Sequence, residues 1–221
     1  RLRAEISRLG VVFVVVDSAL GAIGESAVGD DVASRFMNAL RSFTGTTRLV
    51  IGHVNSYSAT NKPAQARPFG SVQFWNLGRS LWELRKSEEI PADEGLAVAL
   101  FHRKYNPGRL KRPVGLRVTY EGDPDNPDRI LFRRHDVQAD ASLSTGLSLS
   151  ARLIATLRRM GSMKNSELAE EMEETPERVA RAARKLSLVI NLNPSQGGRG
   201  NEALWGPRAV GHDGLDPRDA D

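Results

Sequence analysis

Residues 11–16 form an uninterrupted apolar run, Val-Val-Phe-Val-Val-Val, that leads directly into Asp17 and Ser18. A strand without polar alternation is typical of a parallel sheet that is covered on both faces. Open α/β sheets bind their ligands beyond the carboxyl ends of such strands, which is where Asp17 lies. The run therefore predicts a buried parallel strand that delivers a carboxylate to a nucleotide site.

A second strand follows at the spacing of a β-α-β unit. A helix is predicted to begin at Asp30 or Asp31 as N-cap and to end at Gly45. Residues 48–54 then indicate another buried strand, which contains His53. Crossovers of this kind join parallel neighbours, so the two strands are predicted to pair. The helix has one apolar stripe, formed by Val32, Phe36, Leu40 and Phe43.

The bulk composition limits the possible classes of protein. A length of 221 residues favours one medium domain and one small domain, and 40% hydrophobic residues suffice for a core. The absence of cysteine excludes disulfides and thiolate metal sites, and no apolar stretch is long enough to span a membrane. A net charge of +4 and a pI near 9.7 favour a polyanionic partner. A cytoplasmic location is expected by exclusion.

After residue 54 the chain is first rich in strands and then helical. Residues 55–70 are polar and predict a long loop. Four further strands are predicted as antiparallel additions to the parallel sheet, over residues 80–84, 96–102, 114–120 and 130–134. The predicted organisation is a first domain over 1–137, a linker over 138–147, a second domain over 148–210 and a disordered tail over 211–221.

The second domain has the element order of a winged helix-turn-helix. A helix with an apolar stripe through Leu153 and Leu157 is followed by a shorter one that starts at Asn165, a capping candidate. A third helix opens with Thr175 as N-cap and Pro176 in its first turn. A hairpin with a glycine-rich turn comes next, as the wing requires. This domain is therefore predicted to be small and α+β.

The third of these helices carries the residues expected to contact DNA. Arg178, Arg181 and Lys185 share one face, which is what a recognition helix needs at a groove and its phosphates. Arg199 in the wing is expected to add a contact to the DNA backbone. A protein-binding winged helix remains an alternative, because the second helix is acidic through Glu167, Glu170, Glu171, Glu173 and Glu174.

Several short motifs of the first domain follow one another in a defined order. Asp17 and His53 end successive predicted strands, Gly70 follows the polar loop, and Arg79 comes nine residues later. Lys104 then precedes Tyr-Asn-Pro-Gly. This succession resembles the C-terminal half of the RecA-type core of hexameric replicative helicases. It is most similar to the plasmid RepA-type helicases and related AAA family ATPases.

The resemblance covers roughly residues 5–137 and implies a fold. It is a RecA-like α/β sheet whose parallel strands are extended by antiparallel strands. Its N-terminal part would be missing, since the chain contains no phosphate loop of the form G-x-x-x-x-G-K-[ST]. Ser18 also stands where the family often has a second acid. The fragment alone is therefore not expected to hydrolyse ATP.

The resemblance also implies roles for single residues. Asp17 would hold Mg²⁺ as the Walker B carboxylate, with Ser18 beside it in the nucleotide site, and His53 would sense the state of the nucleotide. Arg79 would be the arginine finger at the neighbouring subunit's γ-phosphate, and Lys104 would add a second cation there. Lys62 would contact DNA. Arg85 is an alternative to Arg79 as the arginine finger.

Two functions follow from these interpretations. The first is the C-terminal part of a ring-forming, ATP- and Mg²⁺-dependent motor, a homohexameric helicase that hydrolyses ATP between its subunits and moves or opens DNA. A helicase loader or a recombination mediator would belong to the same class. The second is a non-catalytic DNA-binding regulator, in which the winged helix acts and a degenerate α/β domain serves assembly.

Overall fold

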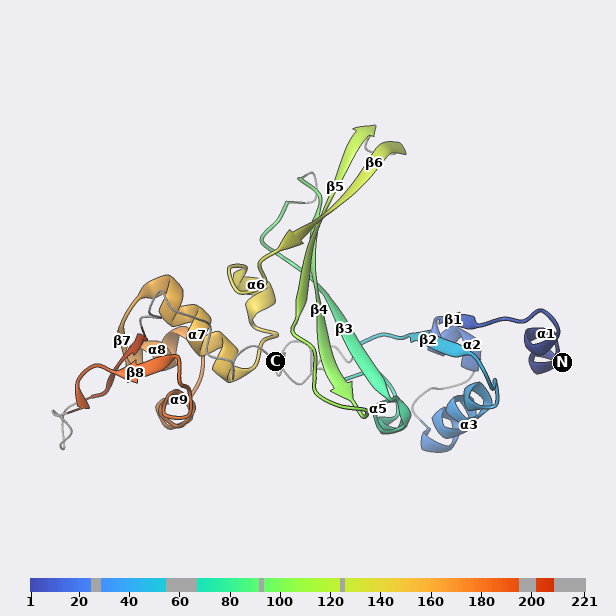
Figure 1. Ribbon diagram of the computed structural model, residues 1–221, viewed down its shortest axis with the longest axis horizontal. Coiled ribbons are helices and arrows are strands. Elements are labelled where there is room, and N and C mark those ends of the chain that lie inside the picture. The colour runs from blue at the N-terminus through green and yellow to red at the C-terminus, as the bar shows by residue number, and fades with distance from the viewer. Residues whose placement is uncertain (25–28, 55–66, 92–93, 124–125, 195–201, 209–221) are drawn as a thin grey trace. The chain divides into compact units, whose positions relative to one another are not determined.

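The computed structural model describes residues 1–24, 29–54, 67–91, 94–123, 126–194 and 202–208 (Figure 1). The chain divides into two compact units. Unit 1 comprises Arg1–Arg85 and Ala99–Val114, and unit 2 comprises Lys86–Val98 and Gly115–Asp221. None of the helices in the described part of the chain is long and apolar enough to cross a membrane.

The N-terminal part of unit 1 is a β-α-β unit. Its two strands are parallel, with Val15 opposite Leu49 and Asp17 opposite Ile51. The predicted pairing of these strands is thus confirmed, and the predicted helix between them is present. The elements are α1 (Leu2–Arg8), β1 (Phe13–Asp17), α2 (Ala19–Ile23), α3 (Asp30–Arg41) and β2 (Thr47–Ile51).

The prediction that these strands are covered on both faces is wrong. Phe13 and Val15 are 51% and 50% exposed, and Leu49 and Ile51 on β2 are 47% and 42% exposed. An apolar run raises the probability of a strand, but it does not specify what covers each face. The register places these four side chains on one open apolar face of a two-stranded sheet.

The main sheet of the chain is a separate, antiparallel one. Its strands follow each other in the order β3-β4-β5-β6, so that each strand pairs with its neighbour in sequence. A short helix, α5, precedes β3. These elements are α5 (Val72–Leu77), β3 (Ser80–Lys86), β4 (Leu96–Tyr105), β5 (Val114–Asp123) and β6 (Asn126–His135).

The predicted RecA-like fold of residues 1–137 is therefore wrong. Composition located all four later strands, but it does not encode which strand lies beside which. Strands joined by short connections pair with each other, and β3 to β6 complete their own ladder in this way. Among the described residues, the parallel sheet has two strands and is not extended.

One face of β3 and β4 buries an ion cluster around an aromatic ring. Glu83 binds the guanidinium of Arg85 at 2.7 Å and that of Arg103 at 2.6 Å. The two guanidiniums lie 5.8 and 4.6 Å from the ring centre of Phe101, which is 2% exposed. Buried charges are tolerated when they are paired and hydrogen-bonded, as these are.

The C-terminal part of unit 2 has the element order predicted for a winged helix. Its three strands form an antiparallel sheet in the order β7-β9-β8. Leu153, Leu157, Leu168 and Val179 are fully buried in its core, and Trp205 is 3% exposed. The elements are α7 (Leu149–Met160), β7 (Met163–Lys164), α8 (Asn165–Glu171), α9 (Pro176–Ala183), β8 (Val189–Asn191) and β9 (Leu204–Pro207).

The segment 138–147, predicted as a linker, contains the short helix α6 (Ala141–Ser144). Asp140 caps this helix, since its side chain accepts a hydrogen bond from the N–H of Leu143. Leu143 is fully buried and Leu147 is 5% exposed. The segment therefore contributes apolar side chains to unit 2. The predicted tail, 211–221, lies outside the described residues.

Candidate nucleic-acid interface

Local sequence determines where α9 begins and which side it buries. The hydroxyl of Thr175 accepts a hydrogen bond from the N–H of Arg178, and Pro176 occupies the first turn, where no N–H is needed. Val179 is fully buried and Ala183 is 1% exposed, so this side faces the core. The opposite side is left to solvent.

Asn165 joins the start of α9 to two other elements. Its Nδ2 donates to the carbonyl of Pro176 at 3.0 Å, and its Oδ1 accepts from Trp205 Nε1 at 2.9 Å. Asn165 is 9% exposed and is the first residue of α8, whereas Lys164 is the N-cap. We call these two hydrogen bonds the Asn165 clamp. The sequence pattern predicted only a cap at this position, because the contacts with Pro176 and Trp205 span 11 and 40 positions.

The solvent side of α9 and the residues just after it carry four basic side chains. Arg178, Arg181, Arg184 and Lys185 are all exposed. Arg178 binds Glu174 at 2.5 Å, and its side chain is 58% exposed. At a rise of about 1.5 Å per residue, the stretch from Arg178 to Lys185 is about 10 Å long. A B-DNA major groove about 12 Å wide accepts a helix of this kind.

The acidic residues beside α9 are largely engaged inside unit 2. Glu167 accepts a hydrogen bond from the Lys164 N–H at 2.9 Å and so caps α8. Glu171 binds Arg159 at 2.7 Å. Glu174 binds Arg152 at 3.5 Å as well as Arg178. These partners reduce the repulsion that the acidic sequence of this region would exert on a polyanion. Glu170 and Glu173 are exposed.

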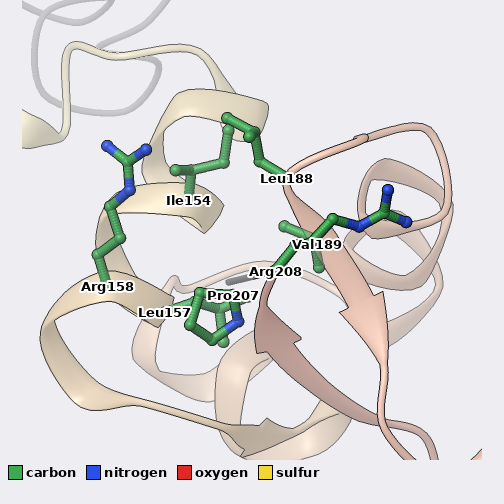
Figure 2. A pocket seen from close by; sticks show the side chains of 7 residues that line it. All are labelled: Ile154, Leu157, Arg158, Leu188, Val189, Pro207 and Arg208. Carbon is green, nitrogen blue, oxygen red and sulfur yellow. The ribbon is translucent and has the colours of Figure 1, made fainter. Parts of the chain in front are cut away.

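A small hollow lies between α7 and the sheet β7-β9-β8 (Figure 2). Its volume is about 30 Å³, enough for one or two water molecules but not for a nucleotide. Figure 2 shows the guanidinium groups of Arg158 and Arg208 at its rim, pointing away from each other. The hollow is also lined by Ile154, Leu157, Leu188, Val189 and Pro207.

The structure brings two of the predicted nucleotide-site residues to one sheet edge. Asp17 lies opposite Ile51 at the carboxyl end of the parallel pair, and His53 follows two residues later. The carbonyl of His53 accepts a hydrogen bond from the Phe69 N–H at 2.7 Å. Ser18 is the N-cap of α2, and its hydroxyl accepts from the Gly21 N–H at 3.4 Å. The parallel pairing thus leaves Asp17 and His53 after neighbouring strand ends, and their roles at a nucleotide remain predictions.

The predicted trans-acting cations have different surroundings. Lys104 Nζ donates to the carbonyls of Trp75 and Asn76 at 2.7 and 2.9 Å, where it neutralises the C-terminal end of α5. Arg79 is exposed, and Arg85 is bound to Glu83 in the buried cluster. Two further predicted contacts, Lys62 and Arg199, lie outside the described residues, as does most of the loop 55–70.

The described residues do not by themselves fit an ATP–Mg²⁺ site. Asp17 supplies one carboxylate, and no group of three or more metal-binding side chains gathers anywhere in the described part of the chain. The chain also lacks a phosphate loop. No step of ATP hydrolysis can therefore be derived from these residues.

Unit 1 also contains a serine–histidine pair that the sequence did not predict. Ser80 Oγ lies 3.0 Å from His102 Nε2, and His102 Nδ1 accepts a hydrogen bond from the Lys111 N–H at 2.9 Å. Because Nδ1 is an acceptor, Nε2 carries the proton and donates it to Ser80. Burial and the nearby charge of Lys111 lower the pKa of His102. His102 is thus a neutral donor and cannot activate Ser80 as a base.

The chain was compared with models of protein families, with curated proteins and with solved structures. None of these comparisons found a match.

Proposed function

We propose that this protein is a non-catalytic DNA-binding protein that contacts duplex DNA through the exposed basic side of α9. The observation that supports this most is that Arg178 and Arg181 lie on the solvent side of α9, whose other side is buried, and that Arg184 and Lys185 are exposed just after its end. Guanidinium and ammonium groups in such a position bind phosphates and base edges.

The ATP-dependent motor is not part of this proposal. It was expected from the resemblance to RecA-type cores, and the sheet that this resemblance requires is absent from the described part of the chain. The roles of Asp17, His53, Arg79 and Lys104 at a nucleotide consequently lack support from the fold. DNA binding by α9 does not depend on them.

The proposal is tested with the full chain and a fluorescein-labelled DNA duplex of mixed sequence, by fluorescence anisotropy. The double variant Arg181→Ala/Lys185→Ala is expected to weaken binding about a hundredfold or more, because it removes two charge-assisted hydrogen bonds that each contribute roughly 1.5 kcal/mol or more. Alanine is a good helix former, so α9 should persist.

A matched control removes the same charge from unit 1. Arg3→Ala/Arg35→Ala changes two exposed arginines on α1 and α3 and is expected to leave the affinity for the duplex within about twofold, because neither side chain belongs to the basic surface of α9. Equal losses in both double variants would mean that net charge, and not the α9 surface, binds the DNA. The proposal would then be abandoned.

A further inference from the structure

A second surface of unit 2 has the chemistry of a base-stacking platform. β5 and β6 run side by side as one antiparallel hairpin (Figure 1). Tyr120 lies opposite Ile130, and Val118 lies opposite Phe132. Side chains of opposite residues in an antiparallel pair project from the same face, so Tyr120, Ile130 and Phe132 share one face.

These three side chains are open to solvent. Tyr120 is 50% exposed, Ile130 is 51% exposed and Phe132 is 67% exposed. β6 is the last strand of the described four-stranded sheet, so this face lies at the sheet's edge. Exposed aromatic side chains that gather on one face mark a binding surface more often than an isolated one does.

The two ends of the hairpin differ in the charge of their side chains. Arg134 lies on the aromatic face, two residues beyond Phe132, and it is exposed. Arg133 is exposed on the reverse face of the same strand. The acids Glu121 and Asp128 lie at the turn end of the hairpin. A polyanion is therefore attracted to the end that holds Phe132 and Arg134.

We propose that this face binds single-stranded nucleic acid, with bases stacked on Phe132 and Tyr120 and a neighbouring phosphate bound by Arg134. Every base has a π-face, so stacking of this kind requires no particular sequence. The planar guanidinium of arginine can bind two phosphate oxygens at once. This inference goes beyond duplex binding by α9, because it uses other residues and another form of nucleic acid.

A second copy of the chain is the other occupant that an open edge strand attracts. The side chains of β6 argue against it, since Arg129, Arg133 and Arg134 place three cations along the strand. Charged side chains on an edge strand disfavour pairing with another strand. Arg129 lies within 3.8 Å of Glu121 at the turn end, whereas Arg133 and Arg134 lie at the other end and favour a polyanion.

The test measures how the full chain binds fluorescein-labelled oligothymidylate, by anisotropy, with an oligonucleotide that covers a site of about 4–16 nucleotides. Phe132→Leu keeps an apolar side chain but removes the ring. It is expected to weaken binding about 5- to 150-fold, the effect of one lost base stack. Phe132→Tyr keeps the ring and should bind within about twofold of the unsubstituted chain.

The control is Phe13→Leu, the same change at a 51% exposed position on β1, and it should leave the affinity unaltered. Unchanged binding by Phe132→Leu, or an equal loss in Phe13→Leu, would overturn the inference. So would a dimer, seen by sedimentation velocity, that Phe132→Leu dissociates without changing the affinity for oligothymidylate.

Each of the two proposals can be refuted without the other. Arg181→Ala/Lys185→Ala should reduce the affinity for the duplex while the affinity for oligothymidylate stays within about twofold. Phe132→Leu should do the reverse. A chain in which both forms of DNA respond only to the α9 variant would overturn the inference about the hairpin and leave the one about α9 intact.

Discussion

Asp140 illustrates how a buried carboxylate of this chain is satisfied. It is 2% exposed, and its Oδ1 accepts hydrogen bonds from the Leu143 N–H at 2.9 Å and the Ser142 hydroxyl at 3.0 Å. Its Oδ2 lies 2.9 Å from His135 Nε2. Burial raises the pKa of Asp140, but hydrogen bonds from Ser87, Leu143, His135 and Ser142 together lower it below its ordinary value.

This pKa predicts a pH dependence of stability with a definite sign. Because the pKa of Asp140 is lower in the folded chain than in the unfolded chain, its contribution is fully present above the unfolded value of about 3.9. The contribution is lost as the pH falls through the folded value. Asp140→Asn keeps the size and the capping ability of the side chain, and it should remove this part of the acid dependence.

Urea denaturation between neutral pH and about pH 3 measures this effect as the free energy of unfolding at each pH. Asp31→Asn serves as the control, since the side chain of Asp31 is 74% exposed on α3. The difference between the unsubstituted chain and Asp140→Asn should shrink as the pH falls. A difference that stays constant over this range would show that the charge of Asp140 does not stabilise the fold.

The turn between α8 and α9 contains a residue with a strained backbone conformation. Glu173 has a φ of 52°, in the left-handed region that glycine adopts without cost. Glu173→Gly is expected to raise the free energy of unfolding by about 0.5–1 kcal/mol, because relief of the left-handed conformation exceeds the entropic cost of glycine. Urea denaturation of the full chain measures the change.

Glu173→Ala separates backbone strain from charge. It removes the same carboxylate but retains the Cβ atom, so it should change the stability by less than about 0.5 kcal/mol. An equal gain in both variants would assign the effect to the removal of an acid near Glu174 and Glu170 rather than to the conformation of the turn.

The elements also indicate what the sequence could predict. Apolar periodicity located α3 and α7, the cap at Thr175 located α9, and strand composition located β3 to β6, because these signals are local. The cap predicted for α3 at Asp30 or Asp31 was wrong, since its N-cap is Gly29. Sheet membership is not local, and the RecA-like fold was wrong for that reason. The basic side of α9 followed from the spacing of Arg178, Arg181 and Lys185. The clamp through Asn165 could not be predicted, because its two partners lie far along the chain.

At the scale of the whole molecule, the position of charge matters more than its sum. A net charge of +4 is modest for 221 residues. Within unit 2, however, Glu171 and Glu174 are paired with arginines, while Arg181 and Lys185 face solvent. The field near α9 is therefore more positive than the composition of the region implies. We therefore expect the proposed binding of duplex DNA to depend on the salt concentration.

The dependence on salt can be predicted from the number of phosphate contacts. Binding to B-DNA releases counterions, and the logarithm of the association constant falls with the logarithm of the salt concentration at a slope of about −0.9 per contact. Arg178 is bound to Glu174, so Arg181, Arg184 and Lys185 together predict a slope of about −3. Anisotropy titrations with duplex DNA over a series of KCl concentrations measure this slope.

Comparing the salt slope of the α9 double variant with that of the unsubstituted chain gives the number of phosphate contacts that Arg181 and Lys185 make. Arg181→Ala/Lys185→Ala should make the slope less steep by about 2, because each phosphate contact that is lost removes about one unit. Arg3→Ala/Arg35→Ala should keep the full slope, although it removes the same charge. A slope that does not change in the α9 variant would mean that these side chains make no phosphate contact, even if the affinity is lower. The positive side of α9 would then act through the long-range field of the protein, and duplex DNA would bind at another surface.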